Sequence, residues 1–79
     1  MRLDKYLKVS RLIKRRTVAN EACDAGRVMI NKKTAKAGTE VKPGDEITIN
    51  FGNKDVRVEV LSVAETVKKE EAKEMFRYL

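Results

Sequence analysis

The hydrophobic period of this chain changes at Gly26, and that change decides which folds are open to it. Before Gly26, apolar side chains recur every three or four residues, which is the spacing of a helical face. After Gly26 they alternate with polar side chains, which is typical of a strand with one buried face. The sequence therefore predicts an α+β fold, in which two short N-terminal helices pack on a small antiparallel sheet.

Two helices are predicted before Gly26. The first covers residues 2–9, where apolar side chains occupy positions i, i+3 and i+4 of one face, namely Leu3, Tyr6 and Leu7. The second begins near Thr17 and ends at Gly26, because glycine commonly follows the last turn of a helix. Residues 10–16 connect the two and end in three consecutive cations, which we expect to point toward solvent or a ligand.

Turn sequences divide the rest of the chain into strands. Residues 28–30 form a short strand that leads into a turn at residues 31–33, since asparagine tolerates a positive φ. A second turn is predicted at residues 41–45, where proline presets φ and the following glycine relaxes it. The clearest strands are residues 47–51 and 56–60, which predict an antiparallel hairpin with one apolar face.

The last 15 residues return to helical spacing. From Glu65 to Leu79, apolar side chains such as Met75 and Phe76 fall toward one side of a helix. We therefore predict a C-terminal helix that packs on the sheet or on a partner.

A length of 79 residues allows one domain, residues 1–79, with a core at about 2–51 and the second hairpin strand and C-terminal helix at 54–79. A chain this short buries only about 60–65% of its unfolded surface, which leaves little stability to hold a strained catalytic cleft. The chain also has no His, no Trp and a single Cys. We expect a protein that is not an enzyme and has no metal or other cofactor.

The lone Cys23 lies in the apolar stretch of the second predicted helix, where we expect a buried and reduced thiol. No apolar run resembles a signal peptide or reaches the length needed to cross a membrane. These features predict a cytoplasmic protein with no membrane partner.

Positive charge is concentrated in the first half of the chain. Residues 1–36 contain 11 basic and 3 acidic side chains, a balance of +8, whereas residues 37–79 contain 7 basic and 9 acidic ones, a balance of −2. Such a polarised charge attracts polyanions, of which phosphate backbones are the commonest inside cells. An anionic membrane surface is the alternative, but it normally needs a strongly apolar helix face or a lipid anchor. Nucleic acid is therefore the predicted ligand.

Four segments occur in an order that is more specific than any one of them. They are Arg2-Leu3-Asp4-Lys5-Tyr6-Leu7, Arg16, Gly26-Arg27-Val28 with Ile30-Asn31, and Val41-Lys42-Pro43-Gly44-Asp45-Glu46-Ile47. In this order they resemble the S-four domain, the alpha-L RNA-binding motif, over about two thirds of the chain. That family often has serine where this chain has Arg15 and glycine where it has Lys32, so Lys32 must accept the turn at a modest cost if its φ is positive.

The complete chain resembles small bacterial ribosome quality-control proteins of this family and, among close relatives, small ribosome-associated heat-shock proteins. The resemblance implies that it binds the large ribosomal subunit, through ribosomal RNA and tRNA, on stalled and split ribosomes. It also implies support for C-terminal tailing of the nascent chain, with a tailing factor as an additional partner. We expect the protein itself to be a monomer.

The cations that we expect to contact RNA are Arg2, Lys5, Lys8, Arg11, Lys14, Arg15, Arg16, Arg27 and Lys32, of which Arg2 and Arg16 match family positions. Each could instead be a solvated surface charge. Asp4 is expected either to pair with a nearby arginine or to favour the N-terminal dipole of the first helix. The four aromatic residues are scattered, which favours recognition of folded RNA by shape and backbone over stacking on single strands.

Two other functions remain open from the sequence. The chain could be a protein-interaction module that docks a partner through its C-terminal helix, with an incidental basic face. It could also be a stand-alone relative of the domains that target RNA-modifying enzymes, although it contains no catalytic module of that kind.

Overall fold

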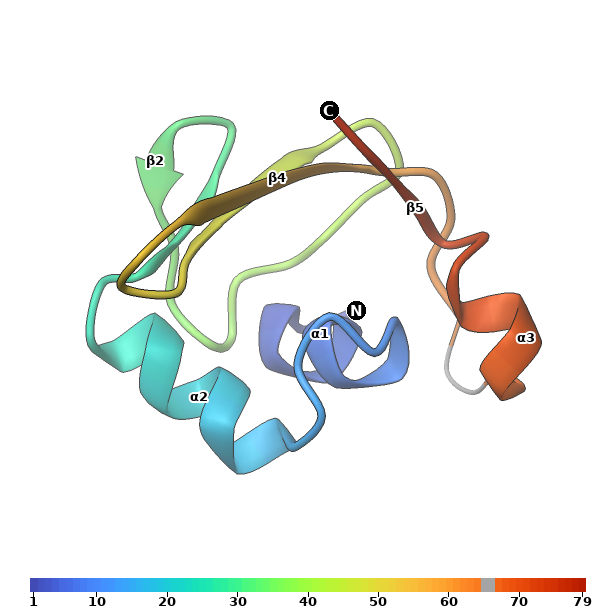
Figure 1. Ribbon diagram of the computed structural model, residues 1–79, viewed down its shortest axis with the longest axis horizontal. Coiled ribbons are helices and arrows are strands. Elements are labelled where there is room, and N and C mark those ends of the chain that lie inside the picture. The colour runs from blue at the N-terminus through green and yellow to red at the C-terminus, as the bar shows by residue number, and fades with distance from the viewer. Residues whose placement is uncertain (65–66) are drawn as a thin grey trace.

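The computed structural model, which describes residues 1–64 and 67–79, has two layers (Figure 1). Helices α1 (Leu3–Val9) and α2 (Arg16–Asp24) lie below one face of an antiparallel sheet. The strands are β1 (Val28–Ile30), β2 (Lys33–Thr34), β3 (Glu46–Asn50), β4 (Asp55–Val60) and β5 (Phe76–Tyr78), in the order β2-β1-β3-β4-β5. The predicted α+β architecture is confirmed.

Both N-terminal helices form where the apolar spacing predicts them. Helix α1 buries Leu3, Tyr6 and Leu7 completely, and α2 turns Ala19 and Cys23 inward. The small side chains of α2 allow close packing against α1. After α2 the backbone turns at Gly26, whose φ of +75° is the left-handed conformation that glycine adopts without strain.

The β1–β2 hairpin has a tight two-residue turn. Ile30 is opposite Lys33, and the residues between them, Asn31 and Lys32, have φ values of 52° and 70°. Two consecutive positive φ values match a type I′ turn, whose twist fits the right-handed twist of the flanking strands. The prediction that Lys32 must accept this turn is confirmed.

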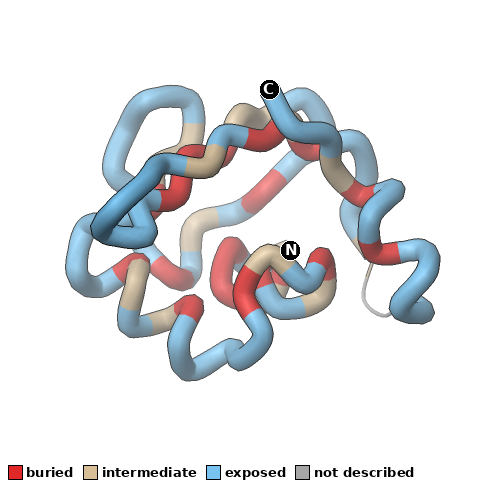
Figure 2. Tube along the Cα trace, viewed as in Figure 1, coloured by how far each residue is buried: buried red, intermediate tan, exposed pale blue. Residues whose placement is uncertain are grey.

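The β3–β4 hairpin has the predicted alternation. Ile47 is opposite Val58 and Ile49 is opposite Val56, so the apolar side chains of both strands share the face toward the helices. They join α1 and α2 in one hydrophobic core, which Figure 2 shows as the buried residues between the two layers. The apolar face of the sheet therefore packs on both helices.

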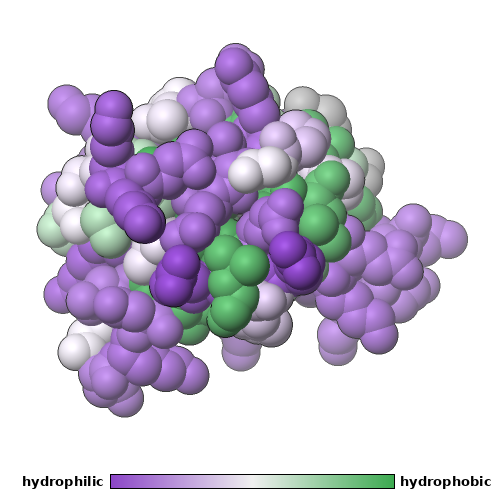
Figure 3. Space-filling view, turned by 90° about the horizontal axis from the view of Figure 1, so that it is seen from above, coloured by the Kyte–Doolittle hydropathy of each residue, from purple (hydrophilic) through white to green (hydrophobic). Residues whose placement is uncertain are grey.

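The opposite face of the sheet is polar. Arg57 forms an ion pair with Glu46 at 3.0 Å, and Arg77 forms one with Glu59 at 2.6 Å. Viewed from this side, the surface is mainly hydrophilic, with smaller hydrophobic areas between the charged groups (Figure 3). Among the described residues, no helix is long and apolar enough to span a bilayer.

The C-terminal segment differs from the prediction. A C-terminal helix is present, but α3 covers only Lys69–Ala72, and the predicted start at Glu65 lies outside the described residues. The extension of this helix over Phe76–Tyr78 is wrong, because these residues form β5 against the edge of β4. Alternating aromatic residues favour a strand when a free sheet edge is available.

The C-terminal segment packs on the core of its own molecule. Ala72 and Met75 are buried, and the Tyr6 hydroxyl of α1 donates a hydrogen bond of 2.8 Å to the Met75 carbonyl oxygen. The same oxygen accepts hydrogen bonds from the backbone N–H groups of Leu61 and Ser62. This junction fixes the chain between α3 and β5, which is why the helix cannot continue.

Candidate nucleic-acid interface

The start of α1 is tied to a segment that follows β2. The Leu3 N–H donates to the Thr39 carbonyl at 2.8 Å, the Asp4 N–H donates to the Ala37 carbonyl at 3.1 Å, and Arg2 forms an isolated bridge with Glu40. These contacts place the side chain of Arg2 beside residues 38–40. The sequence pattern of neither segment indicates this pairing.

Asp4 is the centre of a charged cluster. Its side chain is only 3% exposed, and its two oxygens accept hydrogen bonds from Arg2 Nε at 3.2 Å and Arg2 Nη2 at 3.3 Å. Arg16 Nε lies 3.3 Å from the same carboxylate, and Asn20 Nδ2 donates to it at 3.4 Å. One buried carboxylate therefore joins the N-terminal ends of both helices.

Asp4 remains ionised in this setting. Burial on its own raises the pKa of the carboxyl, but hydrogen bonds from two guanidinium groups, one side-chain amide and one backbone N–H outweigh it. The pKa of Asp4 consequently lies below its ordinary value of 3.8. Of the two roles that the sequence left open for Asp4, pairing with an arginine is the one that the structure shows.

Arg2 and Arg16 keep about half of their surface open to solvent, with side-chain exposures of 54% and 49%. Both line a pocket of about 420 Å³, which is completed by Met1, Lys5, Gly38 and Glu40. A second hollow of about 510 Å³ lies on their other side, toward Thr17 and Glu21. The arginine pair therefore forms a ridge between two concave surfaces.

This geometry suits an anionic ligand. The buried carboxylate engages one edge of each guanidinium group, which limits the side-chain rotation that binding would otherwise have to restrict. Each remaining edge can donate two hydrogen bonds to phosphate oxygens. The first pocket is lined by three cations and one acidic residue, Glu40, whereas the second is lined by the two arginines and by two acidic residues, Asp4 and Glu21. The first pocket therefore carries the more positive lining.

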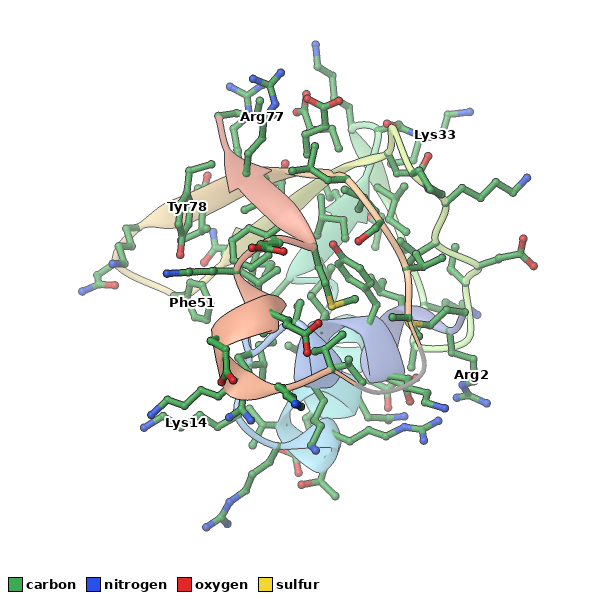
Figure 4. All side chains as sticks on the ribbon, turned by 90° about the vertical axis from the view of Figure 1, so that its right-hand side faces the viewer. Arg2, Lys14, Lys33, Phe51, Arg77 and Tyr78 are labelled. Carbon is green, nitrogen blue, oxygen red and sulfur yellow. The ribbon has the colours of Figure 1, made fainter. Side chains whose placement is uncertain are left out.

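Of the nine predicted contact residues, Arg2, Lys5 and Arg16 meet at the first pocket. Arg27 lines a separate hollow on the surface of α2 with Val18 and Glu21, and Lys32 lies in the β1–β2 turn. The other four, which are exposed in the helical layer, are Lys8, Arg11, Lys14 and Arg15. Figure 4 shows Lys14 and Arg2 on opposite sides of that layer, so the nine do not converge on one spot.

Asn20, Gly38 and Glu40 also belong to the site, although they are not among the residues predicted from the sequence. Asn20 lies one helical turn after Arg16 and could have been found from that spacing. Gly38 and Glu40 reach the site only through the pairing of residues 37–41 with the start of the chain. Such a long-range contact is not visible in local periodicity.

The aromatic residues are not all isolated. Tyr6 is buried in the core, whereas Phe76 and Tyr78 form an edge-to-face contact with ring centres 5.3 Å apart. This pair lies on β5, and neither of its rings lines the pocket of Arg2 and Arg16.

The family model and the curated relatives that match this chain point to the same family. The family model described as the S4 domain matches residues 1–47. A protein of Halalkalibacterium halodurans named "RQC P-site tRNA stabilizing factor" is 62% identical, with 96% of this chain and 86% of the relative covered. A Bacillus subtilis protein of the same name is 60% identical, with 100% of this chain and 92% of the relative covered.

A solved structure supports the fold independently. The trimeric structure of Vibrio cholerae Heat Shock Protein 15 superposes with a TM-score of 0.92 at 28% identity, covering 100% of this chain and 81% of that one. The similarity therefore includes the C-terminal part of the chain, beyond the residues that the family model matches.

Proposed function

Since the chain belongs to the S4 domain family, in the group of the RQC P-site tRNA stabilizing factors, we propose that it binds structured RNA on the large ribosomal subunit and stabilises P-site tRNA there. In this role it acts in the quality control of stalled ribosomes. Its ligands are ribosomal RNA of the large subunit and tRNA, and its place of action is the cytoplasm.

One observation carries this proposal. Arg2 and Arg16 approach each other from different elements and share the buried carboxylate of Asp4, which leaves both guanidinium groups half open at the rim of one pocket. Surface arginines without such a partner lose more side-chain freedom when they bind, so the shared carboxylate favours tight contact with a sugar-phosphate backbone.

The proposed action is binding, without catalysis. The described part of the site offers guanidinium, ammonium and carboxylate groups, which position an RNA backbone by charge and hydrogen bonds. We further propose that the protein acts as a monomer, that a nascent-chain tailing factor is an additional partner, and that the remaining predicted cations give weaker contacts with the same RNA. Support for C-terminal tailing would then follow from holding tRNA in place.

The proposal is tested by the double variant Arg2→Ala plus Arg16→Ala. Binding to purified large ribosomal subunits should weaken by about tenfold or more at physiological salt, since each lost phosphate contact removes about 0.9 from the salt slope. The matched control is Arg57→Ala plus Arg77→Ala, which removes the same charge from two exposed, ion-paired arginines of the sheet. Equal affinities of the two double variants would contradict the proposed site.

A further inference from the structure

The β1–β2 hairpin and the segment after it carry a group of lysines outside the arginine pocket. Lys32, Lys33 and Lys36 are all exposed, and none of them forms an ion pair with any residue that the structure describes. The acidic groups nearby are already engaged. Asp45 accepts hydrogen bonds from the Asn31 side chain and the Lys42 backbone, and Glu46 is paired with Arg57.

Lys32 occupies a backbone conformation that does not suit a side chain. Its φ of 70° is left-handed, where glycine has no steric penalty and a residue with a Cβ does. Asn31, at 52°, belongs to a residue type that tolerates this region, and its side chain stabilises the turn through Asp45. In the part of the chain that the structure describes, no side-chain hydrogen bond of this kind is present for Lys32, so the turn keeps a modest strain at this lysine.

The hairpin lies on the same side of the molecule as Arg2. In Figure 4, Lys33 and Arg2 point toward one side, while Lys14 and the β3–β4 turn lie on the other. The chain that connects them, residues 36–40, passes directly beside the arginine, because a Cβ on Gly38 would lie 3.9 Å from the Arg2 guanidinium group. The segment with the exposed Lys36 therefore connects the hairpin to the arginine pocket.

We propose that this hairpin is a second RNA-contact site, at which Lys32 and Lys33 bind a stretch of sugar-phosphate backbone distinct from the one at Arg2 and Arg16. The inference rests on the proposed function, and it moves the contact surface away from the helical layer toward the edge of the sheet. Exposed ammonium groups without acidic partners lose no ion pair when they meet a phosphate, which makes them effective contacts.

The test uses Lys32→Gly and Lys33→Ala, with Lys54→Ala of the β3–β4 turn as the matched control. Each hairpin variant should bind purified large ribosomal subunits about fivefold more weakly near 150 mM salt and reduce the salt slope by about 0.7–0.9, as expected for one phosphate contact. Lys32→Gly should also unfold at the same or a higher urea concentration, because glycine relieves the left-handed strain. Lys54→Ala should bind like the natural chain.

The outcomes separate the two proposals. If both hairpin variants bind like Lys54→Ala while the double variant of Arg2 and Arg16 binds weakly, the second site is refuted and the proposed function stands. If the hairpin variants weaken binding and the arginine variant does not, the arginine pocket is refuted. Weaker binding by Lys33→Ala with an unchanged salt slope would also refute a phosphate contact at the hairpin.

Discussion

Asp4 combines a structural and an electrostatic role in one side chain. Its buried carboxylate satisfies hydrogen-bond donors from Arg2, Arg16 and Asn20, which belong to three different places in the sequence. Replacing a buried charged acceptor leaves its donors without an equivalent partner, and that loss costs more than the net value of the original bonds. The residue is therefore expected to affect both folding and binding.

We predict that Asp4→Asn lowers the free energy of unfolding by about 1–3 kcal/mol at neutral pH. Because the folded-state pKa of Asp4 lies below its unfolded value, its contribution is present above about pH 4 and is lost as the pH falls through the folded pKa. The gap between the natural chain and the variant should consequently close on acidification, as measured by urea unfolding from pH 7 to pH 3. A gap that stays constant over this range would show that Asp4 does not stabilise the fold as a carboxylate.

Cys23 is predicted to be chemically inert in the folded state. Burial, together with the negative charges of Asp4 and Asp24, raises the pKa of its thiol to about 11, so almost no thiolate exists at pH 8. Alkylation by iodoacetamide at pH 8, followed by mass spectrometry, should be far slower than in urea-unfolded protein. Equal rates in both states would contradict the burial of this thiol.

At the arginine site, the individual residues could be predicted from the sequence, but their contacts with one another could not. The sequence identified Arg2 and Arg16 as candidates and offered pairing with an arginine as one role of Asp4. It could not show that both arginines share one carboxylate, because that depends on how α1 and α2 pack. It also could not exclude Lys14 from the neighbourhood of Arg2, since adjacent cations in a connecting segment can point in any direction.

At the scale of elements, the junction of α1 with the C-terminal segment is the least local contact of the fold. The Tyr6 hydroxyl and the Met75 carbonyl oxygen are 69 residues apart in the sequence. A hydrogen bond in this buried setting contributes about 1 kcal/mol, and its loss leaves the Met75 oxygen with two backbone donors. The bond therefore stabilises the docking of α3 and β5 on the rest of the molecule.

We predict that Tyr6→Phe lowers the free energy of unfolding by about 0.5–1.5 kcal/mol. Hydrogen exchange should accelerate first at the amides of Phe76–Tyr78, because this strand loses its anchor to α1. Exchange measured by NMR would locate the effect, and the amides of β3 serve as the internal reference. A uniform acceleration across the sheet would contradict a local role of the hydroxyl.

The two helices and the β3–β4 hairpin could be predicted because each carries a full period of apolar side chains and a clear turn. Strand β5 could not be predicted in this way, because three residues are too few to show a period. Its partner strand, β4, also lies well before it in the sequence. In the Met75–Leu79 stretch, helical spacing places Met75, Phe76 and Leu79 on one side, whereas strand alternation places Phe76 with Tyr78. Residues 76–78 form a strand because the edge of β4 is available for pairing.

At the scale of the whole molecule, charge and layering coincide. The helical layer and the β1–β2 hairpin come from the part of the chain with a balance of +8, whereas β3, β4 and the C-terminal segment come from the part with a balance of −2. The arginines of the acidic half are paired with glutamates across strands. The positive potential therefore comes mainly from residues 1–36, which hold the proposed contacts.

We predict a strong salt dependence of RNA binding. If about six phosphates are neutralised, the logarithm of the association constant should fall with the logarithm of salt concentration at a slope of about −4 to −5. Titrations of large ribosomal subunits between 50 and 300 mM KCl would measure this slope. A slope shallower than about −2 would indicate that apolar contacts, rather than the cations, carry the affinity.

The hydrogen bond between Tyr6 and Met75 also bears on when the protein can mature. During synthesis the first helix emerges long before residue 75 exists, so the core facing it must wait for nearly the entire polypeptide. A nascent copy that has not yet reached Met75 lacks strand β5 and the anchor of helix α1. The first helix therefore gains its full set of contacts only late in synthesis.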